Sequence, residues 1–141
     1  MTSPIIPILG PPLPLPLMSA NVPAGFPSPA EDYVQGQLDL NDHLITRPAA
    51  TYYVRATGDS MIGAGIHAGD LLIVDKAEEA VSGRVVIAAI DGELTVKRIE
   101  RRGRRVLLKA ENPLYPPIIF EDDDAAELVV WGVVTAVIHR P

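Results

Sequence analysis

The chain has 141 residues, a length that fits one compact domain, since single domains cluster near about 100 to 150 residues. Its formal net charge of -6 argues against a chain that grips nucleic acid through phosphate neutralisation, and the lack of cysteine excludes disulfides, thiolate zinc sites and a cysteine nucleophile. Hydrophobic residues make up 48% of the chain but aromatic residues only 5%, so we expect a mainly β structure with an aliphatic core.

The first 27 residues differ from the rest, because they are rich in proline and carry no charged side chain. Proline fixes φ and removes a backbone donor, so residues 1–27 are predicted to form a flexible, extended arm. A secretory signal is the competing interpretation, but lysine and arginine are absent near the start and prolines interrupt the apolar run. No segment approaches the ~18 uninterrupted apolar residues of a membrane span, so we expect a soluble, cytoplasmic protein that makes no membrane contact.

Residues 28–141 are predicted to form a β-rich domain that begins with a short helix. Residues 28–31 have the form of a capping box with proline at the first helical position. Val34 and Leu38 would lie on the buried side of this helix. Residues 39–42 then offer cap and turn residues, after which the pattern changes to strands.

The later segments alternate between strand-like runs and short turns. Asp91-Gly92 between two such runs is a strong hairpin signal, and Arg102-Gly103 predicts a second turn. The strands are predicted over residues 51–57, 70–75, 83–90, 93–100, 104–110 and 127–139. With strands and short turns outnumbering helices, the chain reads as a compact, curved β domain.

Ser60 and Lys97 form a candidate nucleophile and general base. Ser60 follows Gly58, which permits a sharp turn that could expose the hydroxyl, with Asp59 and Met61 supporting the turn and its backbone N–H groups aimed at an oxyanion. An unshifted lysine would pay about 4 to 5 kcal/mol to be neutral at pH 7, so burial must lower its pKa. From these residues alone, the alternative is that Ser60 lies in an ordinary turn and Lys97 is a solvated lysine on a strand.

The strand after Asp91-Gly92 also predicts the surroundings of Lys97. Alternation with a period of two places Thr95, Lys97 and Ile99 on one face and Leu94, Val96 and Arg98 on the other. The lysine is therefore expected to stand among apolar neighbours.

Three motifs in one order resemble the LexA/UmuD family of self-cleaving proteins. They are Gly58-Asp59-Ser60-Met61, the segment 69–75 and the segment 91–97. The chain is most similar to the UmuD-type SOS mutagenesis branch, and the resemblance runs from Gly25 to the C-terminus. It implies a fold of the LexA/signal-peptidase-like type.

The resemblance also implies a function in the SOS response to DNA damage. By similarity Ser60 attacks the chain's own Ala24-Gly25 bond, Lys97 takes the serine proton, and a RecA filament on single-stranded DNA stimulates the reaction. The trimmed product would be the accessory subunit of a UmuC-type Y-family polymerase for translesion synthesis. No cofactor is implied. A closely similar family member has cysteine where this chain has Ala24, and most of the arm before Val22 does not resemble the family.

Other classes of protein fit less well. A LexA-like repressor needs a helix-turn-helix before the cleavage site, which a proline-rich arm cannot form, so no direct sequence-specific DNA binding is expected. A signal peptidase uses a similar pair of residues but requires a membrane anchor. A non-catalytic polymerase-binding module with a vestigial serine and lysine remains the alternative.

Family resemblance further implies a homodimer. Residues 129–138 are expected to provide its interface, through an exposed strand edge. The basic hairpin around residues 101–105 could meet phosphates, although a solvated tip is as good an interpretation, and residues 121–124 are predicted to be a charged surface loop. His43, His67 and His139 lack the spacing of metal ligands, so no metal site is expected.

Overall fold

The computed structural model describes residues 10–19, 22–25, 34–121 and 127–141. It divides into two units, the first ending at Thr46 and the second beginning at Arg47. The predicted boundary between residues 27 and 28 lies in the undescribed segment 26–33, so it stays a prediction.

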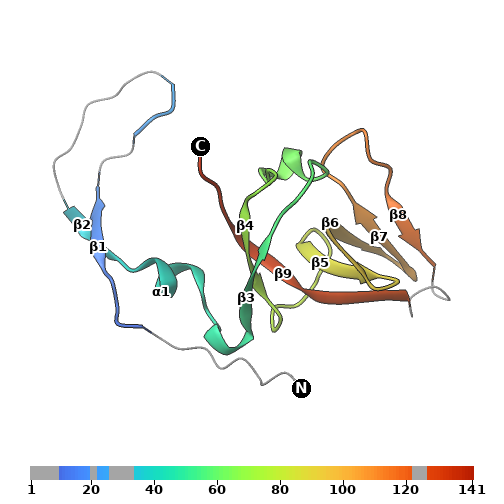
Figure 1. Cartoon of the computed structure of the whole chain (residues 1–141), viewed down its shortest axis with the longest axis horizontal. Coiled ribbons are helices and arrows are strands. Elements are labelled where there is room, and N and C mark those ends of the chain that lie inside the picture. Colours follow the sequence, from blue (N-terminus) through green and yellow to red (C-terminus); the bar gives the residue numbers. More distant parts are fainter. Residues whose placement is uncertain (1–9, 20–21, 26–33, 122–126) are drawn as a thin grey trace. The chain divides into compact units, whose positions relative to one another are not determined.

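The first unit contains a two-stranded antiparallel pair and one short helix. Strand β1 (Leu15–Met18) pairs with β2 (Val34–Leu38), and α1 spans Leu40–Leu44 (Figure 1). The carboxylate of Asp39 caps α1 by accepting a hydrogen bond from the Asn41 N–H at 3.0 Å, as the sequence predicted for this cap.

The helix predicted around Val34 and Leu38 is wrong, because both residues lie in strand β2. Gly36 in the middle of this segment disfavours a helix, and backbone pairing with β1 satisfies the strand instead. Val34 is 59% exposed rather than buried. The predicted helix start at residues 28–31 lies outside the described residues.

The second unit is an antiparallel β domain. Its described residues form one seven-stranded sheet in the order β3-β4-β9-β5-β6-β7-β8. The strands are β3 (Thr51–Arg55), β4 (Leu71–Asp75), β5 (Val85–Ile90), β6 (Glu93–Arg102), β7 (Arg105–Lys109), β8 (Ile118–Phe120) and β9 (Leu128–Ile138), with short 3-10 turns η1 (Pro48–Ala50) and η2 (Ile62–Ala64). The prediction of a mainly β fold is confirmed.

All six strands predicted in the second unit are present. The hairpin at Asp91-Gly92 is confirmed: both residues have positive φ, at 50° and 83°, and Ile90 pairs with Glu93 across the turn. The turn at Gly103 likewise connects β6 to β7. Strand β8 was missed, because three residues beside a proline pair carry little periodic signal.

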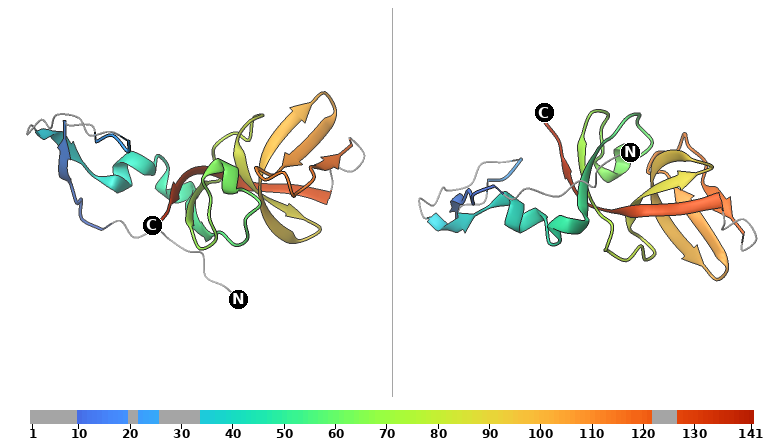
Figure 2. Two further views of the ribbon diagram at one scale, coloured as in Figure 1. Left: turned by 90° about the horizontal axis from the view of Figure 1, so that it is seen from above. Right: turned by 60° about the horizontal axis from the view of Figure 1, so that its bottom comes forward.

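Strand β9 runs through the middle of the sheet, with its C-terminal half on β4 and its N-terminal half on β5 (Figures 1 and 2). The register shifts on both sides, leaving Thr135 opposite β4 and Trp131 opposite β5 as extra residues. Such bulges bend a strand, which is how one long strand serves both halves of a curved sheet. Gly132 is required between them, since a Cβ there would lie 2.6 Å from a methyl group of Val74.

The expected dimer interface near residues 129–138 stays a prediction: β9 lies between β4 and β5 in the strand order, but residues 128–133 pair with β5 and residues 133–138 pair with β4, so each half of β9 is paired along one side. Among the described strands of this sheet, β3 and β8 are the ones at the edges. The sequence could not show this, since a valine-rich run fits a central strand and an edge strand equally well.

Two apolar clusters support the sheet. One contains Met61, Leu72 and Val74 and lies beneath the serine turn; the other contains Ile99, Leu108 and Val133. Over the described part of the chain, no helix is long and apolar enough to cross a membrane.

Candidate active site

The turn that carries Ser60 lies between β3 and η2. Gly58 has φ of 74°, a left-handed conformation that a side chain would strain, and it reverses the chain just before the serine. Met61, 2% exposed, anchors the turn in the core beside Leu72. Ser60 itself remains half-buried, so its hydroxyl is held in place yet open to a substrate.

A second segment holds this turn from outside. The backbone N–H of Glu111 donates to the Ser60 carbonyl at 2.9 Å. The Asn112 side-chain amide donates to the Asp59 carbonyl at 3.0 Å, and the Tyr115 hydroxyl donates to the Asp59 carboxylate at 2.7 Å. The Asp59 carboxylate therefore supports the turn, as the sequence predicted, through a partner that lies far along the chain.

Lys97 reaches Ser60 from the middle of β6. Its Nζ lies 3.0 Å from the Ser60 Oγ, 2.9 Å from the Thr95 Oγ1 and 3.1 Å from the Val96 carbonyl oxygen. The residue is 8% exposed. The prediction that Thr95 and Lys97 share a face is confirmed by their side-chain contact.

Burial lowers the pKa of the Lys97 amine below its ordinary value, because desolvation penalises the charged form. Among the ion pairs formed by described residues, none involves Lys97, so no carboxylate counteracts this effect. The direction agrees with the expectation drawn from the sequence.

The three partners of Lys97 are all oxygens that can accept, so they suit an ammonium, and they also suit a neutral amine when the Ser60 hydroxyl donates to it. A neutral amine has two N–H groups and one lone pair, whereas an ammonium has three N–H groups and no acceptor. The Val96 carbonyl oxygen can only accept, and the Thr95 hydroxyl can accept a second N–H. The lone pair is then left to face the Ser60 hydroxyl.

A cleft of about 300 Å³ opens beside the pair. Its walls come from the end of β3 and the turn that follows, from the core beneath, and from the start of β6; they are lined by residues 54–58, Ser60, Met61, Ile66, Ile87 and residues 94–96. Such a cleft between strand ends suits an extended peptide.

The remaining site predictions concern the arm and the backbone around Ser60. Ala24 and Gly25 are exposed and belong to the first unit. Among hydrogen bonds between described residues, none is donated by the backbone N–H of Ser60 or Met61, which leaves both groups available to an incoming oxygen.

Three residues of the site were missed or only partly predicted from the sequence. Thr95 was placed on the correct face, but its contact with Lys97 was not predicted. Asn112 and Tyr115 gave no local signal, because their partner Asp59 is more than fifty residues away.

A buried lysine in hydrogen-bond contact with a serine, at the mouth of a cleft in a β domain, is an arrangement suited to a serine peptidase. The family model of the peptidase S24-like proteins matches residues 16–135. Protein SamA of Salmonella typhimurium is 54% identical over 125 residues, covering 89% of this chain and 85% of SamA. Protein MucA of Escherichia coli is 38% identical over 128 residues, covering 90% and 86%.

The LexA repressor of Shewanella sediminis is 42% identical over 126 residues, which cover 89% of this chain and 60% of that repressor. The chain thus belongs to the peptidase S24-like family, as a UmuD-like member of the LexA/UmuD group. The resemblance found in its motifs is confirmed.

Proposed function

We propose that this protein is a self-cleaving serine peptidase of the SOS response, which cuts its own Ala24-Gly25 bond with Ser60 as nucleophile and Lys97 as general base. The observation that carries the proposal is the 3.0 Å contact between the Lys97 Nζ and the Ser60 Oγ, made by a buried amine whose pKa is lowered.

In the first step the neutral Lys97 amine takes the Ser60 hydroxyl proton while the Oγ attacks the carbonyl carbon of Ala24. The resulting oxyanion is stabilised by the backbone N–H groups of Ser60 and Met61. The Lys97 ammonium then returns the proton to the nitrogen of Gly25 as the peptide bond breaks. This leaves an ester between Ser60 and Ala24.

In the second step water hydrolyses the ester. Lys97, neutral again, accepts a proton from the water as the hydroxide oxygen attacks the ester carbonyl, and then returns a proton to the Ser60 oxygen. The products are the arm ending at Ala24 and a chain beginning at Gly25. Serine and lysine are regenerated, and no other group is consumed.

The arm suits such a substrate. Ala24 and Gly25 are exposed and small, and the surrounding sequence is rich in proline, which disfavours helix and keeps the segment extended. Because substrate and catalytic groups belong to one chain, or to two paired chains, much of the association entropy is already removed.

Relatives and resemblance together support a setting for this reaction. The proposed trigger is a RecA filament on single-stranded DNA, and the trimmed protein would act as a homodimeric accessory subunit of a UmuC-type Y-family polymerase in translesion synthesis. The alternative is a non-catalytic polymerase-binding module with a vestigial serine and lysine. The contacts of the Lys97 Nζ with the Ser60 Oγ and the Thr95 Oγ1 favour the catalytic proposal, since a vestigial pair would not need them.

The test is intact-mass analysis of the purified full chain incubated with activated RecA filaments. The wild type should yield a fragment that begins at Gly25, and Ser60→Ala and Lys97→Ala should yield none. Ser82→Ala is the matched control, because its hydroxyl contacts the backbone of Arg101 and neither Ser60 nor Lys97, and it should be cut like the wild type. An uncut wild-type chain, with filaments or at alkaline pH, would support the binding module instead.

A further inference from the structure

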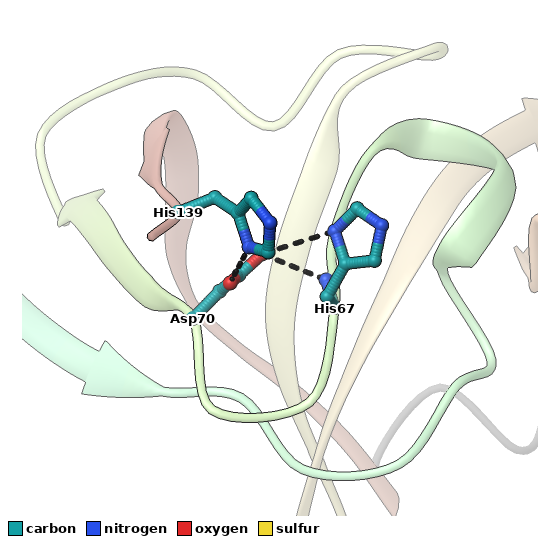
Figure 3. Close-up of side chains that lie close together, drawn as sticks. All are labelled: His67, Asp70 and His139. Atoms are coloured by element: carbon teal, nitrogen blue, oxygen red, sulfur yellow. Dashed lines mark hydrogen bonds and ion pairs between the residues drawn. The ribbon is translucent and has the colours of Figure 1, made fainter. Parts of the chain in front are cut away.

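His67, Asp70 and His139 converge at the end of the sheet where β4 begins and β9 ends. Figure 3 shows the two imidazole rings beside one another, each joined to the Asp70 carboxylate by a dashed line. The His139 Nδ1 lies 2.6 Å from the Asp70 Oδ1, the His67 Nδ1 lies 3.5 Å from the Asp70 Oδ2, and the ring centroids are 4.4 Å apart. None of these groups takes part in the proposed peptidase chemistry.

One of these atoms lacks a hydrogen-bond partner. The His67 Nδ1 is shielded from solvent, and no described residue accepts from it or donates to it within hydrogen-bond distance. At 3.5 Å the Asp70 carboxylate is too far for a good hydrogen bond. A buried polar atom without a partner costs free energy, and this one lies beside a carboxylate and a second imidazole, both of which are groups that ligate metal ions.

The backbone holds the three residues in place. In the tight turn before β4 the backbone N–H of His67 donates to the Asp70 Oδ2 at 2.7 Å. Leu71 pairs with Ile138 in the next rung of the β4–β9 ladder, which fixes Asp70 and His139 opposite each other. The ligand atoms are thus presented by a turn and a sheet rather than by loose ends.

The electrostatics favour a cation. The Asp70 carboxylate is 4% exposed and is the acidic group of the three, so it places a negatively charged acceptor beside two imidazole rings whose nitrogens can ligate. The side chains of His67 and His139 are 45% and 44% exposed, which leaves a path for an ion from solvent.

We propose that His67, Asp70 and His139 form a binding site for a divalent transition metal of the Zn²⁺ class. Two imidazole nitrogens and one carboxylate oxygen are a common zinc set, with a fourth position left to water. Ligand atoms at about 2.0 to 2.2 Å from a tetrahedral zinc lie roughly 3.3 Å apart. The three ligand atoms here already lie within 4.8 Å of one another, so side-chain rotations suffice to bring them to a metal.

Metal binding would tie the end of β9 to the turn before β4. That turn is joined to the cleft, because Gly69 donates to the Ala56 carbonyl and Ala56 donates to the Asp70 carbonyl, both at 2.8 Å, and Ala56 lines the cleft. A bound ion should therefore stabilise the second unit, since a ligand that binds only the folded state raises its stability.

The test measures binding directly. The tag-free, chelator-treated full chain is titrated with Zn²⁺ in competition with a chromophoric chelator, and with Co²⁺ while its visible absorption is followed. One ion per chain should bind to the wild type and to His43→Ala, the matched control for the remaining histidine. His67→Ala and His139→Ala should each weaken binding by at least ~10-fold, since even outer-shell partners of metal ligands commonly contribute that much.

Two further readouts test the proposal independently of the affinities of the single variants. Zn²⁺ should shift the imidazole proton signals of His67 and His139 but not of His43, and it should raise the melting temperature of the wild type but not of the double variant His67→Ala/His139→Ala. Equal Zn²⁺ affinity in the wild type and the double variant, or no binding to either, would overturn the proposal and leave the cluster as a structural hydrogen-bond network.

Discussion

The two units of this chain are stabilised in different ways. The described part of the first unit, before Arg47, has no buried side chain: all of β1 is exposed, and β2 pairs with it mainly through backbone hydrogen bonds. The second unit packs two apolar clusters against a bent sheet in which residues such as Leu72 and Ile99 are fully buried. A two-stranded pair with no core is at best marginally stable, whereas a larger sheet with a packed apolar face can be stable by itself.

This difference suits the proposed division of roles. A substrate segment must leave its resting conformation to enter a cleft, and little free energy opposes this where few apolar contacts form. A nucleophile and a base must instead stay within about 0.5 Å of their productive geometry. The packing around Ser60 and Lys97 in the second unit provides this restraint. Substitutions in the two units should therefore have very different consequences.

The largest effect is expected for Lys97→Met in the second unit. Loss of the general base should slow self-cleavage by about 10² to 10⁴-fold, the usual contribution of such a group. The folded chain should be no less stable at pH 7, because a buried amine with a lowered pKa is replaced by an apolar side chain of similar size. The rate of self-cleavage measures the first effect, and urea unfolding measures the stability. Lys109→Met, which removes an exposed lysine paired with Glu100, should be cut at the wild-type rate; equal rates for all three chains would refute the role of Lys97.

The next effect compares matched leucines in the two units. Leu72→Ala should lower the free energy of unfolding by about 2 to 5 kcal/mol, because it leaves a cavity in the core below the serine turn. Leu17→Ala in β1, where the side chain is 41% exposed, should change it by no more than about 0.5 kcal/mol. Equilibrium urea denaturation followed by circular dichroism would distinguish them. Comparable losses would mean that β1 contributes to a common core.

A smaller effect, about 1.4 kcal/mol for each pH unit, follows from the lowered pKa of Lys97. Below that pKa only a small fraction of the amine is neutral, so the rate of unstimulated cleavage should rise roughly tenfold per pH unit and level off before pH 10.5. The unfolded chain binds the proton more tightly, so the cost of burying Lys97 is present at neutral pH and is relieved as pH rises between the folded and unfolded pKa values. Rates measured from pH 7 to 10 provide the check, and a flat profile would contradict it.

The smallest effect is expected at the segment that holds the serine turn. Tyr115→Phe removes the hydroxyl that donates to Asp59, on an exposed part of the surface. Stability should fall by about 0.5 to 1 kcal/mol, the usual contribution of such a hydrogen bond, and cleavage should slow severalfold because the turn is less restrained. Tyr53→Phe, which alters an exposed tyrosine on β3, is the control. A cleavage rate unchanged by Tyr115→Phe would show that Glu111 and Asn112 suffice to hold the turn.

Much of the fold and the proposed catalytic pair could be predicted from local sequence. The strands of the second unit follow from valine-rich runs and turn residues, and Asp91-Gly92 fixes the register of its hairpin. Alternation along β6 placed Lys97 beside Thr95, and Gly58 predicted the turn at Ser60, because both depend on conformational preferences of neighbouring residues.

Tertiary structure alone decided the features that join distant parts of the chain. Val34 and Leu38 lie in a strand because β1 pairs with them, and residues 128–138 form a central strand because β4 and β5 flank them. His139 meets Asp70 across sixty-nine residues of sequence, so no spacing of histidines could reveal the cluster. Local propensity determines which segments extend or turn, but the partners of each segment depend on the burial and hydrogen bonding of the whole chain.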